Sequence, residues 1–464
     1  RVMVAAGPAA SSDDRFATLR AAVERARRVP FYVRHLAGAR LEQPDDFVRL
    51  PLTRKEHLAE ASPLGMLAVP PAHAWHYHES SGTTGEPIST WCGLAELGRM
   101  ASDVVALVPE LAAPDAMLLN RFPSFAPIHF VIEEVLRQTG RCHIAAGTMS
   151  WDVPFSRALG FLRRLPVTVL ATLPLEPVLL REVARTEGVD LAQECTSLQV
   201  MILAGAVLPA ALRRSVEASW RVRVVEIYGS NETMLLGVSC VRGALHLLTD
   251  LLEAEILDPE TLAPVSPGTP GLLTVTSLVH EVMPLVRYVT GDLVQIDPAP
   301  CACGAPTPTA RVLGRAADVV AIGGARLTPY ALLDVCYEFI EAIGARVFFV
   351  VVLRRGLELL VEAPEPAPAT RVAEEHRLAA ALGVPVTVQY LEEGDVLDRS
   401  ALFRSPKIYK PSQVSDWRGG GRKTVTIMEA LLEWPTFDLR TIGRIVRRQV
   451  RSARRRKRLT SSDR

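Results

Sequence analysis

Short apolar runs alternate with amphipathic stretches between residues 100 and 300, and this alternation constrains the fold more than any other feature of the sequence. The strand-like runs lie at 167–173, 198–203 and 222–227, and the helical stretches lie at 176–188 and 209–219. Strands that alternate with helices in this way are typical of a mostly parallel sheet covered by helices. The sequence therefore predicts an α/β fold with parallel-rich sheets for this large part of the chain.

A smaller unit is predicted from about residue 320. Strand candidates at 345–353, 357–361 and 385–391 bracket helix candidates at 329–342 and 370–382. This order predicts a compact α+β domain, and Gly419-Gly420-Gly421 after it has the composition of a linker. We therefore predict three parts: an N-terminal domain over residues 1–314, a mobile C-terminal domain over 315–417, and a partly disordered basic tail over 418–464. Near the start of the chain, Thr53 is predicted to cap a helix, with Glu56 three residues on.

Composition and charge narrow the class of protein. Of the 464 residues, 48% are hydrophobic and 22% are charged, which is typical of a globular chain. No apolar run approaches the ~18 residues of a membrane-spanning helix, and no signal-peptide pattern is present, so we expect a cytoplasmic protein without a membrane span. Seven cysteines in a chain of this length do not indicate a secreted disulfide framework.

The net charge of +1 hides a basic end. Residues 440–464 carry ten Arg, one Lys and one Asp, which leaves a net charge of −9 on the rest. The Arg cluster has no interleaved aromatic residues, so specific nucleic-acid binding is not expected. The remaining interpretations are a solubilising disordered tail, which we favour, and a cluster that binds acidic lipid or docks an acidic carrier protein.

Four short motifs have residue types suited to binding a nucleotide. The first is a hydroxyl-rich loop, in which two glycines free the backbone to wrap an anion and hydroxyl groups donate to it. Its residues are Ser80, Ser81, Gly82, Thr83, Thr84, Gly85, Glu86 and Pro87. It is not a Walker loop, because the Gly-Lys-Ser/Thr sequence is absent. Taken alone, it is equally well interpreted as a flexible turn.

The other three motifs place charged side chains next to apolar strands. Tyr228-Gly229-Ser230-Asn231-Glu232-Thr233 follows the run at 222–227, where a carboxylate can hold Mg²⁺ on a nucleotide. The segment 287–293 presents Asp292, whose carboxylate can accept hydrogen bonds from ribose hydroxyls, and the segment 314–318 carries Arg315. Taken alone, the segment 228–233 is better interpreted as a capped strand-to-helix turn, and Asp292 is alternatively interpreted as the cap of its turn.

A metal constellation is the remaining candidate. Cys240 and His246 form one pair, and Cys301 and Cys303 form another. Three thiolates and one imidazole suit a closed structural zinc site. The two pairs lie far apart in the sequence, so their spacing alone is weak evidence for such a site. The alternative is two surface cysteines in a Pro-rich loop plus one core cysteine.

Together, in this order and at these spacings, the four motifs resemble those of the adenylate-forming superfamily of acyl-CoA synthetases, luciferases and adenylation domains. The closest likeness is to the phenylacetate-CoA ligase branch. It is supported by Val29-Pro30-Phe31-Tyr32, by residues 50–56 and by the hydroxyl-rich loop, and it extends over roughly residues 15–417. The resemblance implies a large N-terminal adenylate-forming domain, a small mobile C-terminal domain, and activation of a carboxylate with MgATP.

The resemblance also implies roles for individual residues. Ser80 to Gly85 would hold the β- and γ-phosphates, Glu232 would bind Mg²⁺, and Thr233 would lie at the α-phosphate. Tyr228 would lie against adenine with Gly205 and Ala206 on its other side, while Asp292 would take the ribose hydroxyls and Arg315 would lie near ribose or phosphate. Some relatives with a similar cysteine and histidine pattern hold zinc, which favours a structural Zn²⁺ at the four-residue constellation.

A lysine of the small domain bridges the reacting groups in this family. Lys407 and Lys410 are the candidates, and Lys410 is preferred because it lies nearer the expected last strand. His129 and Phe125 occupy the region where relatives contact the substrate carboxylate. Two departures stand out: Glu86 replaces a common Lys in the hydroxyl-rich loop, and Ala317 replaces the usual Asp or Lys of the hinge.

The sequence therefore predicts ATP-dependent activation of an aryl or acyl acid and transfer to coenzyme A, in secondary metabolism. Its cofactors would be ATP, Mg²⁺, coenzyme A and structural Zn²⁺, and its partners a small-molecule acid and possible carrier protein. Three alternatives remain: an enzyme that adenylates nitrite for an aryl amine, one that transfers the acyl group to a carrier protein, and a nucleotide-binding scaffold.

Overall fold

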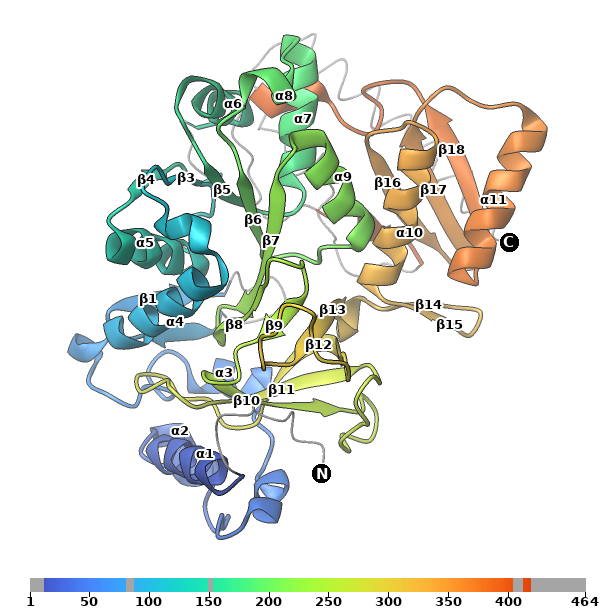
Figure 1. Cartoon of the computed structure of the whole chain (residues 1–464). Helices are drawn as coiled ribbons and strands as arrows, with labels where there is room; N and C mark the ends of the chain where they lie inside the picture. The colour runs from blue at the N-terminus through green and yellow to red at the C-terminus, as the bar shows by residue number, and fades with distance from the viewer. Residues whose placement is uncertain (1–11, 81–86, 149–152, 404–411, 419–464) are drawn as a thin grey trace, which may run out of the picture.

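The computed structural model describes residues 12–80, 87–148, 153–403 and 412–418 (Figure 1). An eleven-stranded sheet runs through its largest part. In spatial order its strands are β10 (Leu252–Leu257), β11 (Gly271–Ser277), β12 (Tyr288–Ile296), β13 (Thr309–Arg315), β9 (Leu245–Leu247), β8 (Met234–Ser239), β7 (Arg223–Ser230), β6 (Val200–Ala204), β5 (Val169–Thr172), β3 (Met117–Asn120) and β4 (Cys142–Ala145).

One half of this sheet is parallel, as the alternation of strands and helices predicts. Strands β4, β3, β5, β6 and β7 pair in parallel, and β5 and β6 are buried along their whole length. The helices of this region are α4 (Leu94–Leu107), α5 (Pro127–Thr139), α6 (Phe155–Arg164), α7 (Glu176–Glu187), α8 (Leu191–Glu194) and α9 (Ala210–Trp220). The α/β prediction is confirmed here, because each apolar run forms a strand and each amphipathic stretch a helix.

The other half of the sheet is antiparallel and begins where β8 folds back on β7. Three N-terminal helices, α1 (Ser12–Ala26), α2 (Pro30–His35) and α3 (Lys55–Ala61), pack against this half and share its apolar core (Figure 1). The predicted cap at Thr53 is wrong, since helix α3 begins after Arg54. The Thr53 hydroxyl instead donates to the carbonyl of Val286, and residue 53 pairs with Tyr288 of β12.

Two small hairpins and several short helices complete the elements around the large sheet. Strands β1 (His76–Glu79) and β2 (Ser89–Cys92) form one hairpin, and its connection is the hydroxyl-rich loop. Strands β14 (Val320–Ile322) and β15 (Ala325–Leu327) form the other. The short 3₁₀ helices are η1 (Pro44–Arg49), η2 (Pro71–His73), η3 (Pro109–Ala112) and η4 (Ala316–Asp318).

The last described part is an α+β unit, as predicted. Its sheet has the order β18 (Val386–Leu391), β17 (Gly356–Glu362), β16 (Phe348–Leu353) and β19 (Val414–Asp416), with α10 (Pro329–Ala342), α11 (Pro368–Leu382) and η5 (Arg399–Phe403) beside it. We call these elements the C-terminal unit; they lie at one side of the large sheet in Figure 1. The proposed boundary between residues 314 and 315 stays a prediction, as does the tail from residue 418.

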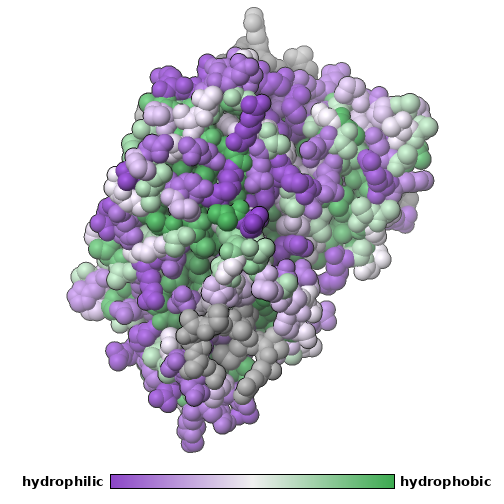
Figure 2. Space-filling view, in the orientation of Figure 1, coloured by the Kyte–Doolittle hydropathy of each residue, from purple (hydrophilic) through white to green (hydrophobic). Residues whose placement is uncertain are grey.

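Hydrophilic and hydrophobic residues are mixed over the face drawn in Figure 2. Among the described residues, none of the helices combines the length and apolarity needed to cross a bilayer.

Candidate functional site

The candidate site forms where β7 ends and the sheet changes from parallel to antiparallel pairing. Ligands bind at such edges because the strands' carboxyl ends open into a crevice. Gly229 is required there, because a Cβ at this position would lie 1.8 Å from the carbonyl oxygen of Met234. The turn that follows is held by Thr233, whose hydroxyl lies 2.9 Å from that of Ser230. This geometry fixes the buried carboxylate of Glu232 at the end of the strand.

Asp292 lies at the centre of the site, and two side chains from other strands contact it. The phenol of Tyr228 donates to Oδ2 of Asp292 at 2.7 Å, and Nε of Arg315 lies 2.9 Å from Oδ1. Register explains the second contact, because residues 292 and 315 face each other across β12 and β13. Arg315 also donates to the carbonyl of Thr290 at 3.0 Å. Three of the sequence-predicted site residues are thus brought together.

Burial and neighbouring charge keep the phenol of Tyr228 protonated. Burial raises its pKa well above the ordinary range of a tyrosine, and the Asp292 carboxylate raises it further. Burial likewise raises the pKa of Tyr288, with the Glu232 carboxylate as the next cause. The Glu232 carboxylate therefore lies near enough to Tyr288 and Arg315 to act on both side chains.

Gly205 and Ala206 directly follow β6, the strand next to β7. Both residues are exposed, and Gly205 has a φ of 86°, which glycine adopts without strain. They therefore lie at the same sheet edge as Tyr228, as the interpretation of an adenine site requires.

The base of the hydroxyl-rich loop is joined to the Glu232 turn. The amide of Ile88 donates to the hydroxyl of Ser80 at 2.9 Å, and the amide of Ser80 donates to the carbonyl of Ile88 at 2.9 Å. Asn231 links the two motifs, because its side-chain amide donates to the carbonyl of Glu79 at 3.3 Å. Sequence reasoning gave Asn231 no role, although it lies inside the motif.

Several predicted site residues cannot be placed. Ser81, Gly82, Thr83, Thr84 and Gly85 lie outside the described residues, and so do the candidate lysines Lys407 and Lys410. Their roles stay predictions.

His129 and Phe125 lie at the carboxyl end of β3, as expected for an acyl pocket beside the sheet edge. Nδ1 of the buried His129 is 2.8 Å from the carbonyl oxygen of Phe122 and 3.3 Å from Nδ2 of Asn120. Phe125 is half exposed. Asn120, which the sequence did not single out, joins His129 to His143 through its side-chain amide.

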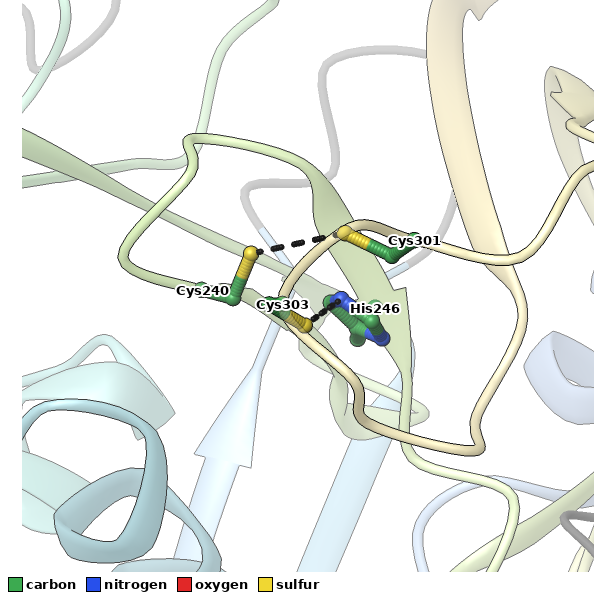
Figure 3. Close-up of side chains that lie close together, drawn as sticks. All are labelled: Cys240, His246, Cys301 and Cys303. Atoms are coloured by element: carbon green, nitrogen blue, oxygen red, sulfur yellow. Dashed lines mark hydrogen bonds between the residues drawn. The ribbon is translucent and has the colours of Figure 1, made fainter.

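Cys240, His246, Cys301 and Cys303 form one cluster between the β8–β9 turn and the β12–β13 loop (Figure 3). Their four ligand atoms lie within 4.8 Å of one another. The Sγ atoms of Cys240 and Cys301 are 3.9 Å apart, and Sγ of Cys303 is 3.3 Å from Nε2 of His246. The spacing along the sequence is long, and the pairing of β9 with β13 brings the two segments together.

The cluster has the dimensions of a tetrahedral zinc site. Zn–S and Zn–N bonds of about 2.3 and 2.0 Å place ligand atoms roughly 3.5–3.8 Å apart. His246 is fully buried, and its Nδ1 lies 3.0 Å from the carbonyl oxygen of Thr307, which leaves Nε2 free to bind a metal. Backbone amides of Arg242 and Ala305 each point at a thiol sulfur. The residues therefore fit a structural Zn²⁺, and occupation of the site is a proposal.

The sequence of this chain is similar to those of known enzymes. The sequence model for the family described as AMP-binding enzyme matches residues 75–283. The phenylacetate-coenzyme A ligase of Thermus thermophilus is 31% identical over 361 residues, which are 73% of this chain and 78% of that protein. The Escherichia coli phenylacetate-coenzyme A ligase is 27% identical over 330 residues, 67% of this chain and 72% of that protein.

A solved structure has a similar fold at low identity. It is 2-hydroxyisobutyryl-CoA ligase in the postadenylation state with R3-HIB-AMP, which is 20% identical and has a TM-score of 0.76. The match covers 88% of this chain and 89% of that one.

Proposed function

Because the chain belongs to the AMP-binding enzymes, in the branch of the phenylacetate-coenzyme A ligases, we propose that it activates a carboxylic acid with ATP and transfers the acyl group to coenzyme A. The observation that carries this proposal is the convergence of Tyr228, Glu232, Asp292 and Arg315 at one edge of the sheet. These residues come from strands far apart in sequence. Their grouping has the charge pattern that a nucleotide triphosphate needs, with carboxylates for ribose and metal and a guanidinium beside them.

Asp292 is the proposed ribose ligand. The phenol of Tyr228 contacts one carboxylate oxygen, and the guanidinium of Arg315 contacts the other. An oriented carboxylate of this kind is a suitable acceptor for ribose hydroxyls. Arg315 holds the orientation of the Asp292 carboxylate, so the acceptor geometry exists before ATP binds.

Glu232 is the proposed Mg²⁺ ligand. Its carboxylate is buried at the end of β7, next to the base of the hydroxyl-rich loop through Asn231. Bound Mg²⁺ would offset charge on the phosphates. The substrate carboxylate oxygen attacks the α-phosphorus, a new P–O bond forms, and the bond to pyrophosphate breaks. Arg315, which lies beside Asp292, is the proposed source of positive charge that would stabilise the developing negative charge.

Lys410 is the proposed bridge between the reacting carboxylate and phosphate, with Lys407 as the second candidate. The chain has only five lysines, and these two lie near the expected last strand of the C-terminal unit. An ammonium group there would stabilise charge on the substrate carboxylate and the α-phosphate at once.

An aryl acid is the proposed substrate class. Aromatic rings gather beside His129: the ring centroids of His129 and Phe130 are 5.3 Å apart, and those of Phe130 and His76 are 3.7 Å apart. Such rings favour a flat apolar acyl group. We further propose that the enzyme acts in secondary metabolism, in the cytoplasm, and that the cysteine and histidine cluster holds Zn²⁺ in a structural role.

Pyrophosphate release from MgATP tests the proposal across aryl acids, fatty acids and nitrite, each with and without coenzyme A. Release with an aryl acid, followed by formation of its coenzyme A thioester, would support it, and an E232Q variant should lose most of this activity. Release only with nitrite and an aryl amine, or transfer only to a carrier protein, would overturn the proposed acceptor. The absence of release from every acid would favour a scaffold.

A further inference from the structure

The C-terminal unit packs against helices α6, α7 and α9 of the large sheet, and the contact is partly apolar. Helix α10 contacts α9, and η5 contacts both α6 and α7. Val183 of α7, Leu212 of α9, Ile340 of α10 and Leu402 of η5 belong to a single cluster of buried apolar residues. The unit is therefore docked through a continuous core in the arrangement seen here (Figure 1).

A buried group of charges lies within this contact. Glu182 of α7 is completely buried, and Oε2 accepts from Nε and Nη2 of Arg399 at 3.0 and 2.7 Å. Nε of Arg346, just before β16, lies 3.0 Å from the other oxygen of Glu182. Both arginines belong to the C-terminal side of the chain, and both meet the Glu182 carboxylate of α7.

Arg399 also contacts a carboxylate of its own unit. Its Nη1 donates to Glu362 of β17 and to the carbonyl of Leu397. Oε1 of Glu362 accepts from the backbone amides of Gly394, Val396 and Leu397 at 3.0, 2.7 and 2.8 Å. One guanidinium therefore joins the segment before η5, the sheet of the C-terminal unit and helix α7.

Buried ion pairs differ from apolar contacts where two parts of a protein dock and separate. While the parts are docked, the cost of desolvating both charges offsets the attraction between them. Once the parts separate, water solvates both charges again. Misaligned docking leaves an unpaired buried charge, which is strongly unfavourable. Such a pair therefore specifies one orientation without making the contact permanent.

The place of Arg399 in the chain connects this orientation to catalysis. Helix η5 ends at Phe403, four residues before Lys407, and four residues span at most ~14 Å. Anchoring Arg399 on α7 thus fixes where the lysine-bearing segment begins.

We propose that Arg399 is a positioning residue: through Glu182 it holds the C-terminal unit on α7 in the arrangement that adenylates the acid. This inference rests on the function proposed above. It assigns the pair a role in the first half-reaction, and none in transfer of the acyl group from an existing acyl-adenylate to coenzyme A.

The test separates the two half-reactions in E182Q and R399K. E182Q keeps the size of the side chain and leaves Arg399 paired with Glu362, and R399K keeps the positive charge without the guanidinium. Acid-dependent exchange of pyrophosphate into ATP should fall about tenfold, while conversion of supplied acyl-adenylate to the thioester should change less than about twofold. Equal losses in both steps would show a merely structural role and overturn the proposal.

The matched control is E338Q. It removes the ion pair between Arg214 of α9 and Glu338 of α10, which joins the same two parts but is more than half exposed. Exposed pairs contribute little, so both half-reactions should be unchanged. A selective loss of adenylation in this control would overturn the proposal as well.

Amide hydrogen exchange over residues 176–187 provides a readout that needs no substrate. Exchange should be faster in E182Q and R399K than in the unchanged protein or E338Q, because the C-terminal unit would then be docked on α7 for less of the time. If no acid releases pyrophosphate, the proposed function fails and this measurement still decides the docking role: unchanged exchange would contradict it.

Discussion

The phenol of Tyr228 donates a 2.7 Å hydrogen bond to Asp292, which lies 64 residues later in the chain. The bond joins the last strand of the parallel half of the sheet to the antiparallel half. Arg315 completes the contact from a third strand. The ribose-binding carboxylate that we propose is therefore oriented by the sheet itself, before any nucleotide arrives.

The Y228F variant tests the value of this orientation. A hydrogen bond to a charged group contributes about 1.5–3 kcal/mol, so loss of the phenol should raise KM for ATP by at least about tenfold. KM for the acid should change little, because the proposed role of Tyr228 is to orient Asp292 for the ribose and includes no contact with the acid. Steady-state rates over both substrates measure this. Y390F, which alters a phenol of the C-terminal sheet, is the control, and a rise in KM for the acid instead would contradict the assignment.

The K410A variant tests the choice between the two lysines. Removal of a preorganised charge at the reacting group should lower adenylation by a factor on the order of 10²–10³. K407A should lower it far less. Pyrophosphate exchange measures this step, and thioester formation from supplied acyl-adenylate serves as the internal control. The opposite ranking of the two variants would assign the role to Lys407.

Metal analysis tests the cysteine and histidine cluster. We expect zinc in the purified protein, and its loss from C303S, which removes the sulfur 3.3 Å from His246. Because the cluster ties the β12–β13 loop to the β8–β9 turn, the thermal midpoint should also fall. C142S is the control, since Cys142 is exposed and outside the cluster. Zinc retained at the same level in C303S would rule out this site.

Glu253 predicts a pH dependence of stability. This carboxyl is buried, and burial raises its pKa to about 7. The guanidinium of Arg15, whose Nε lies 2.7 Å from the carboxylate, acts in the opposite direction. The folded protein therefore keeps a proton that the unfolded chain loses near pH 4.5, so the group's contribution to stability falls as pH rises from about 4.5 to 7. The change is roughly 3 kcal/mol.

Urea denaturation at pH 5 and pH 8 measures this effect. E253Q has no proton to lose, so the stability of the unchanged protein relative to E253Q should decrease between the two pH values. A difference that stays constant with pH would show that Glu253 is ionised in both states.

Much of the fold followed from local patterns. The run at 198–203 became β6, and the amphipathic stretch at 209–219 became α9, because period and apolar content reflect burial directly. The wrong cap at Thr53 shows the limit of this reasoning. A threonine can cap a helix, or it can pair with a distant strand. At Thr53 the contacts with Val286 and Tyr288 stabilise the second arrangement.

Buried charges were the main omission. Arg121 is completely buried and pairs with Glu176, yet neither residue stands in a motif. Glu182 and Arg399 were missed for the same reason. A charged residue is normally exposed, so only a partner far away in sequence makes its burial favourable, and no local pattern reports that partner.

The sequence by itself determined the type of each element and the family, because periodicity and short motifs depend on neighbouring residues. It also supplied Tyr228, Glu232, Asp292 and Arg315 as candidates. Only the tertiary structure decided that β7, β12 and β13 meet at one edge, and that Cys240 lies 3.9 Å from Cys301. The reason is physical: strand pairing joins residues separated by long stretches of chain, and their contacts depend on the register of the whole sheet.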